Sequence, residues 1–319
     1  MTRRMLYPDG KQFAFTIVDD TDVATVANVG PIYALLKSLG MRTTKTVWPF
    51  RWRGEGSNFV SSQTLEDPDY VEFVKQLAAD GFEIASHGAT MESSDRATTE
   101  AALARHQELF GVIPRLYVNH SFNRENVYWG TDRIDNPILK RLYARVNGRP
   151  SGFYQGTVPG SSWWWGDLCQ THHEYVRNLT FSSLNVLKAN PSMPYSDSSR
   201  PFVRSWFSSA DADNCQEFID LVTPDRVDQL EAEGGVCIIS THLGKRYVTD
   251  GRVHPDVERA LRDIARRSGW FVPVSPLLDW LRTQQRAATA GTLPASEWRG
   301  MQWRWAVDLL RRRLQSKRR

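Results

Sequence analysis

The chain has 319 residues, of which 41% are hydrophobic and 24% charged, an ordinary composition for a globular protein with a sizeable core. The net charge of +4 is unevenly distributed, because residues 286–319 carry nine basic and two acidic side chains, which leaves −3 for the rest of the chain. Because residues 1–285 have no excess of basic side chains, this part of the chain does not favour nucleic-acid binding. No apolar run approaches the roughly 18 residues that a membrane span requires.

The cysteines and the N-terminal residues indicate in which cellular compartment the protein is expected. Cys169, Cys215 and Cys237 are far apart and show no paired spacing, which argues against a disulfide framework and against a cysteine zinc site. The basic start of the chain is not followed by the apolar segment of a secretory signal. A cytoplasmic location is therefore expected.

The first half of the chain alternates short apolar runs with helical patterns. The pair Asp67-Pro68 is typical of a helix start, with Asp as the cap and Pro at the first helical position, and Gly81 is a typical helix end. Residues 148–185 lack a regular pattern and are predicted to form a long loop region. In chain order we expect strand 13–18, helix 24–39, strand 43–48, helix 68–81, strand 82–85, helix 95–110, strand 116–118, helix 224–234, strand 236–240, helix 255–268, strand 270–274 and helix 276–286.

Strand–helix alternation of this kind predicts a parallel sheet, either closed as a barrel or open and doubly wound. In both architectures the functional groups gather at the C-terminal ends of the strands. No internal repeat or break divides residues 1–286, so this stretch is predicted to be one domain. Residues 287–319 form a separate basic tail.

Acids and histidines follow four of the predicted strands. A lone histidine at a strand end is more often a surface residue than a ligand, and an aspartate there is often the cap of the next helix. Four strand ends that each deliver such a group to one rim favour a functional site. The residues are Asp19, Asp20 and Asp22 after the first strand, His87 after the third, Asn119-His120 after the fourth and His242 after a late strand.

Carboxylate oxygens and imidazole nitrogens together suit Zn²⁺ or a similar divalent ion. Such an ion lowers the pKa of bound water toward roughly 7. A neighbouring carboxylate can then accept a proton, and a histidine can protonate a leaving group.

Three of these segments resemble the motifs of the NodB-like polysaccharide deacetylases. The segments are Phe15–Asp20, Gly81–His87 and Cys237–His242, and the resemblance spans roughly residues 10–285. It implies an α/β fold, a distorted (β/α) barrel that usually has seven strands. It also implies a metal-dependent amide or ester hydrolase, with Asp19 as the base, Asp20 and His87 as metal ligands and His242 as the general acid.

The chain departs from the family where a second metal-binding histidine is expected. Met91 stands four residues after His87, and thioether sulfur is a poor ligand for such an ion. His120 could supply the missing imidazole, which gives the ligand set Asp20, His87 and His120 for zinc or, alternatively, cobalt, nickel or manganese. The alternative is that the metal site is broken and that the protein binds sugar without catalysis.

Further residues are candidate contacts of the substrate or of the metal ligands. Asn119, Asn123 and Glu125 could bond sugar hydroxyls, support the metal ligands or cap their loop. Trp129 could stack on a sugar ring or pack as part of a lid. Arg204 is predicted on a strand, where it could orient Asp19 as an arginine does in the family.

The tail helix carries Trp298, Met301, Trp305 and Leu309 at helical spacing, with arginines between them. That composition is typical of an interfacial membrane helix over residues 296–319. Docking on the barrel or oligomerisation would also explain the apolar stripe.

The predicted activity is the removal of an N-acyl or O-acyl group from a carbohydrate, such as a lipid-linked or nucleotide-linked sugar, in bacterial surface-polysaccharide metabolism. This last association follows from a divergent branch of the superfamily that Asp19–Asp22, His87, Asn119-His120 and Tyr128–Gly130 resemble. An inactive sugar-binding barrel is the alternative. Glycoside hydrolysis also uses two carboxylates but leaves three strand-end histidines unexplained.

Overall fold

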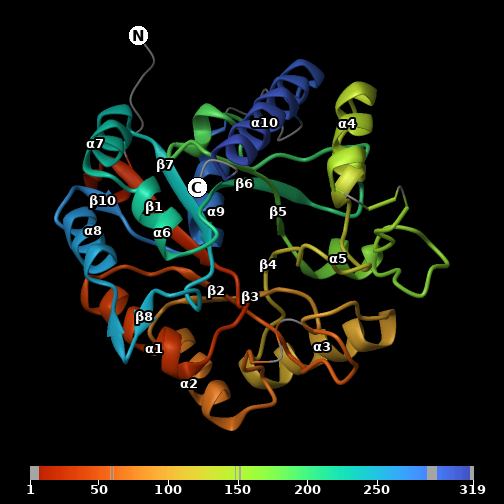
Figure 1. The fold of residues 1–319 in the computed structure, drawn as a ribbon, viewed down its shortest axis with the longest axis horizontal. Helices are drawn as coiled ribbons and strands as arrows, with labels where there is room; N and C mark the ends of the chain where they lie inside the picture. The colour runs from red at the N-terminus through yellow and green to blue at the C-terminus, as the bar shows by residue number, and fades with distance from the viewer. Residues whose placement is uncertain are drawn as a thin grey trace.

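The computed structural model describes residues 7–57, 59, 61–147, 149–150, 152–285 and 293–316. Seven parallel strands form a closed barrel in which each strand pairs with the next and the seventh pairs back with the first, so the predicted barrel is confirmed (Figure 1). The strands are β1 (Phe13–Asp19), β2 (Thr44–Val47), β3 (Glu83–Ser86), β4 (Leu116–Tyr117), β5 (Tyr175–Phe181), β6 (Ser205–Asp211) and β7 (Val236–Thr241).

Helices surround the barrel and bury the outer faces of its strands (Figure 1). This two-sided burial explains why β1 and β7 are buried along their whole length and mostly apolar, with no alternation of buried and exposed residues. The helices are α1 (Val26–Ser38), α2 (Pro68–Ala79), α3 (Arg96–Phe110), α4 (Pro137–Asn147), α5 (Gly166–His172), α6 (Cys215–Leu221), α7 (Pro224–Glu233), α8 (Pro255–Ala265), α9 (Val274–Gln284) and α10 (Ala295–Ser316).

Short elements complete the fold. A two-residue strand, β10 (Gly269–Trp270), pairs with β1 outside the barrel ring, and β8 (Val248–Thr249) with β9 (Arg252–Val253) forms a separate hairpin. Three 3₁₀ turns lie at Pro8–Gly10, Gly130–Arg133 and Val186–Lys188.

The region predicted as a long loop, residues 148–185, contains α5 and β5, and this corrects the prediction. β5 has no apolar periodicity because Arg177 and Asn178 interrupt it, and its pairing with β6 shifts register between Arg177 and Thr180. A buried strand with polar residues at its centre therefore escaped the periodicity criterion.

The tail helix α10 packs on the barrel. Trp298, Met301 and Trp305 are buried in a cluster that includes Val176 and Leu179 of β5. The docking alternative therefore accounts for the apolar stripe, and the two buried tryptophans are not available to a membrane. Among the described residues, no helix combines the length and the apolarity that crossing a membrane would need.

Candidate metal centre and catalytic groups

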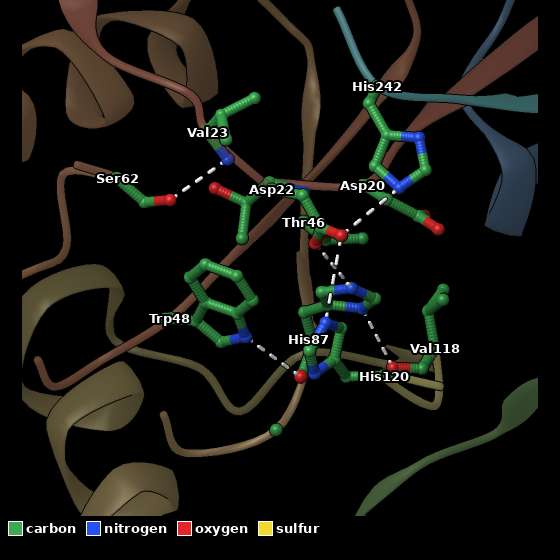
Figure 2. A network of polar contacts seen from close by, with 12 residues as sticks. Asp20, Asp22, Val23, Thr46, Trp48, Ser62, His87, Val118, His120 and His242 are labelled. Atoms are coloured by element: carbon green, nitrogen blue, oxygen red, sulfur yellow. Dashed lines mark hydrogen bonds and ion pairs between the residues drawn. The ribbon is translucent and has the colours of Figure 1, made fainter. Parts of the chain in front are cut away.

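The acids at the end of β1 point in alternating directions, as the pleat of an extended chain requires. Asp19 faces α1, where it accepts a hydrogen bond from the hydroxyl of Tyr33 at 2.9 Å. Asp22 faces the histidines at the other strand ends (Figure 2), and Asp20 lies close enough to His87 and His242 for both to lower its pKa. Thr25 caps α1 by accepting a hydrogen bond from Asn28, so Asp22 is not the cap of the following helix.

Asp22 lies at the centre of three imidazoles (Figure 2). Its Oδ1 lies 3.3 Å from Nε2 of His87. Its Oδ2 lies 3.3 Å from Nε2 of His242 and 3.6 Å from Nε2 of His120. Ligand atoms of Asp22, His87 and His120 all lie within 4.8 Å of one another, and all three residues are buried. The carboxylate between the two histidines is therefore Asp22, whereas Asp20, the predicted ligand, pairs with Arg177.

The other ring nitrogen of each histidine is held by an oxygen that can only accept. Nδ1 of His87 donates to the carbonyl of Val118 at 2.9 Å, and Nδ1 of His242 donates to the carbonyl of Asp213 at 2.7 Å. Nδ1 of His120 donates to the side-chain oxygen of Asn123 at 3.0 Å. In a neutral imidazole the proton then sits on Nδ1, and the Nε2 lone pair faces Asp22.

The pKa shifts of Asp22 and the three histidines indicate that positive charge would be stabilised between them. Burial alone would raise the pKa of Asp22, but His120, His242 and His87 outweigh it and hold this pKa well below the usual value. Burial would lower the pKa of His120 and of His242, but Asp22 raises both. Burial dominates at His87 and lowers its pKa. Lone pairs and a carboxylate that converge in this way need protons or a cation between them.

Asp20 is fixed by an arginine from the opposite side of the barrel. Nη1 and Nη2 of Arg177 on β5 reach its two carboxylate oxygens at 2.9 and 2.7 Å, and Arg177 also donates to the hydroxyl of Ser240. Burial would raise the pKa of Asp20, but Arg177, His87 and His242 lower it overall. Asp20 is thus an oriented, ionised carboxylate beside the histidine cluster.

Asp19, the predicted base, has partners within the fold at both carboxylate oxygens. Its Oδ2 lies 3.0 Å from Nζ of Lys45, its partner across β1 and β2, and neither side chain is exposed. Its Oδ1 accepts from the backbone N–H of Leu243 at 2.8 Å. Asp19 and Asp20 are thus both buried carboxylates with a cationic partner, Lys45 for Asp19 and Arg177 for Asp20.

Arg204 does not orient Asp19. It pairs with Glu174 at 3.4 Å and donates to the carbonyl of Thr171, at an exposed position just before β6. Arg177 occupies the place that was predicted for Arg204, but beside Asp20.

The predicted sugar contacts at Asn119, Glu125 and Trp129 have internal partners. The amide of Asn119 bonds the backbone N–H and carbonyl of Val127, and Trp129 is covered by the guanidinium of Arg133, 4.1 Å from its ring centroid. Glu125 is buried and accepts from Asn123 at 2.9 Å. These contacts favour the loop-capping, packing and supporting alternatives over direct sugar binding.

Sequence reasoning missed Arg177 and Asp213. Arg177 was hidden because its strand was not predicted. Asn123 was among the candidate contacts, and its side-chain oxygen supports the imidazole of His120. Asp213 contributes its backbone carbonyl to His242, and its carboxylate also lies 3.3 Å from Nδ1. No sequence pattern signals a backbone contact of this kind.

No protein-family model matches the chain, and no curated protein matches it. The chain resembles polysaccharide deacetylases of known structure. One from Mycobacterium smegmatis is 17% identical, with a TM-score of 0.48, over 88% of this chain and 94% of that one. One from Pseudomonas aeruginosa PAO1 is 15% identical, with a TM-score of 0.49, over 86% and 93%.

Another similar structure is Puue allantoinase, 14% identical with a TM-score of 0.49 over 88% of this chain and 93% of that one. Identities and scores this low leave the activity to be argued from the site itself.

Proposed function

We propose that the chain is a divalent-metal-dependent hydrolase that removes an N-acyl or O-acyl group from a carbohydrate in bacterial surface-polysaccharide metabolism. One observation carries this proposal. The buried carboxylate of Asp22 meets three imidazole Nε2 atoms, and a second ionised carboxylate, Asp20, lies beside them on Arg177. The family motifs in the sequence supply the substrate class.

Asp22, His87 and His120 are the residues that would hold the ion. The fit is supported by Oδ1 of Asp22, which is buried and has no hydrogen-bond donor among the described residues. The Nδ1 contacts of His87 and His120 leave both Nε2 lone pairs available. This ligand set suits zinc first, with cobalt, nickel or manganese as alternatives. A bound divalent ion would supply Lewis-acid activation of water and of the acyl oxygen.

Asp20 is the proton acceptor in this proposal. Arg177 holds its carboxylate in one orientation and lowers its pKa, so the carboxylate is ionised and positioned before substrate arrives. Acid–base assistance by a positioned group contributes roughly 10²–10⁴-fold to a rate.

His242 is the proton donor. The carbonyl of Asp213 fixes its Nδ1–H and directs Nε2 toward Asp22. Nε2 of His242 lies 3.3 Å from Oδ2 of Asp22, which places the imidazole where it could protonate a departing amine or alcohol.

Aromatic side chains enclose the two histidine ligands. The indole of Trp48 donates to the carbonyl of His87 at 3.1 Å, and its ring lies 5.4 Å from that of His120. Phe59 packs edge-on against His120 at 5.0 Å. This packing restrains the imidazoles and lowers the local dielectric constant, which strengthens electrostatic effects inside the site.

The alternative is a barrel that binds sugar without catalysis. Amine release from an N-acetylated oligosaccharide, measured after reconstitution with Zn²⁺, separates the two. We expect Asp20→Asn and His242→Asn to retain metal and lose activity by at least tenfold, and Asp22→Asn to lose the metal. His172→Asn, outside the site, is the matched control. Sugar binding with release of neither amine nor O-linked acetate would support the alternative, and a chain that takes up no divalent ion would overturn the proposed hydrolase.

A further inference from the structure

A run of stacked aromatic and arginine side chains begins beside the candidate metal centre. We call it the arginine–aromatic ladder; in order of contact it comprises Phe122, Arg149, Phe153, Arg124 and Trp163. The guanidinium of Arg149 lies 5.6 Å from the ring centroid of Phe122 and 4.7 Å from that of Phe153. The guanidinium of Arg124 lies 4.9 Å from Phe153 and 6.0 Å from Trp163.

The inner end of the ladder touches a proposed metal ligand. The ring of Phe122 lies edge-on to His120 with centroids 6.2 Å apart, and Phe122 is 52% exposed. Arg124 is exposed, and Arg149, Phe153 and Trp163 are partly exposed. The ladder is therefore solvent-accessible and is connected to the metal centre through the contact of Phe122 with His120.

The two ladder arginines have no acidic partner. Neither forms an ion pair with any described Asp or Glu, and every Asp and Glu of the chain lies within the described residues. Other arginines of the fold are paired, for example Arg96 with Asp167 at 2.7 Å and Arg177 with Asp20 at 2.7 Å. Two positive charges thus share one phenyl ring, Phe153, without compensation.

Stacking uses the faces of a guanidinium and leaves its in-plane N–H donors free. These donors match the geometry of a carboxylate or a phosphate, which an arginine can bind through two parallel hydrogen bonds. An anion at this position would also relieve the repulsion between Arg124 and Arg149. The exposed ring of Phe122 offers an apolar face on which a sugar can lie next to the metal centre.

We propose that the ladder binds a carboxylate or phosphate group of the carbohydrate, so that the substrate class is an acidic glycan. This inference rests on the proposed function, because it assumes that the sugar to be deacylated lies at the metal centre. Phe122 then contacts that sugar or its neighbour, and Arg149 and Arg124 bind the anionic group further out.

The test compares three probes by calorimetry on the full-length, zinc-loaded protein. The probes are a neutral N-acetylglucosamine tetrasaccharide, an alternating glucuronic acid–N-acetylglucosamine tetrasaccharide and N-acetylglucosamine 1-phosphate. We expect at least one anionic probe to bind about tenfold or more tightly than the neutral one at low salt, and this preference to shrink as salt increases.

Arg124→Gln and Arg149→Gln should reduce the ratio of neutral to anionic Kd toward one. Arg252→Gln, an exposed arginine of β9, should leave the ratio unchanged. Equal affinity of the wild-type protein for all three probes would overturn the proposal, and so would a preference that persists in both ladder variants. Amine release is followed in parallel. Amine release without a preference for anionic probes rejects only the anion-binding role of the ladder. A preference for anionic probes without amine release rejects only the proposed hydrolase activity.

Discussion

The buried pair of Asp19 and Lys45 tests whether Asp19 stabilises the fold or takes part in catalysis. Neither side chain is exposed, and the ammonium lies 3.0 Å from the carboxylate. Burial would lower the pKa of Lys45, but Asp19 outweighs burial and raises this pKa, which favours the charged ammonium. Lys45→Met leaves the carboxylate with two neutral donors, Tyr33 and the backbone N–H of Leu243.

Breaking a buried pair on one side costs about 3–5 kcal/mol, a large part of the roughly 5–15 kcal/mol by which a domain is stable. We expect this loss for Lys45→Met and for Asp19→Asn, and we expect the double variant to recover at least half of the summed loss, because it buries no unpaired charge. Equilibrium urea unfolding followed by tryptophan fluorescence measures each free energy.

Single losses below about 1 kcal/mol, or losses that simply add in the double variant, would refute this reasoning. An Asp19→Asn protein as stable as the wild type but unable to release amine would restore Asp19 as the proton acceptor.

Three further predictions follow from the contacts. Arg177→Gln should lower kcat for amine release about 10–100-fold while metal content stays constant, because Asp20 loses its fixed orientation; an unchanged kcat would contradict this. Burial lowers the pKa of His106 to about 3 and of His173 to about 4, so below pH 6.5 the unfolded chain takes up protons that the folded protein excludes. Stability should therefore be complete above pH 6.5 and about 2 kcal/mol lower per histidine at pH 5, and His106→Phe should flatten the pH dependence of the urea midpoint. Trp305→Ala should destabilise the protein by about 3–5 kcal/mol in thermal unfolding, whereas Trp303→Ala, with 48% of that residue exposed, should change stability by about 0.5 kcal/mol or less.

The strand-end histidines could be predicted from the sequence because apolar runs mark where parallel strands end. His87, His120 and His242 follow such runs and converge on one carboxylate. The sequence could not predict which aspartate meets the histidines. The exact residue at which β1 ends decides which of the aspartates face the inside of the barrel. A shift of one residue exchanges the roles of Asp19 and Asp20.

Arg177 could not be predicted for a different reason. A charged side chain inside a barrel breaks the apolar pattern by which a strand is recognised, and its partner Asp20 is 157 positions away in sequence. The partner of the tail helix could not be predicted either. The spacing of Trp298, Met301 and Trp305 predicted a helix with an apolar stripe, but not what covers it. The surface that covers this stripe belongs to distant elements, including β5.

The proposed ligand set makes one direct prediction about metal binding. Equilibrium dialysis against Zn²⁺, followed by elemental analysis, should give about one ion per chain for the wild type and for Asp20→Ala. Asp22→Ala, which removes the carboxylate between His87 and His120, should lose the ion. Retention of the ion by Asp22→Ala with its loss in Asp20→Ala would contradict the account and return the metal to Asp20.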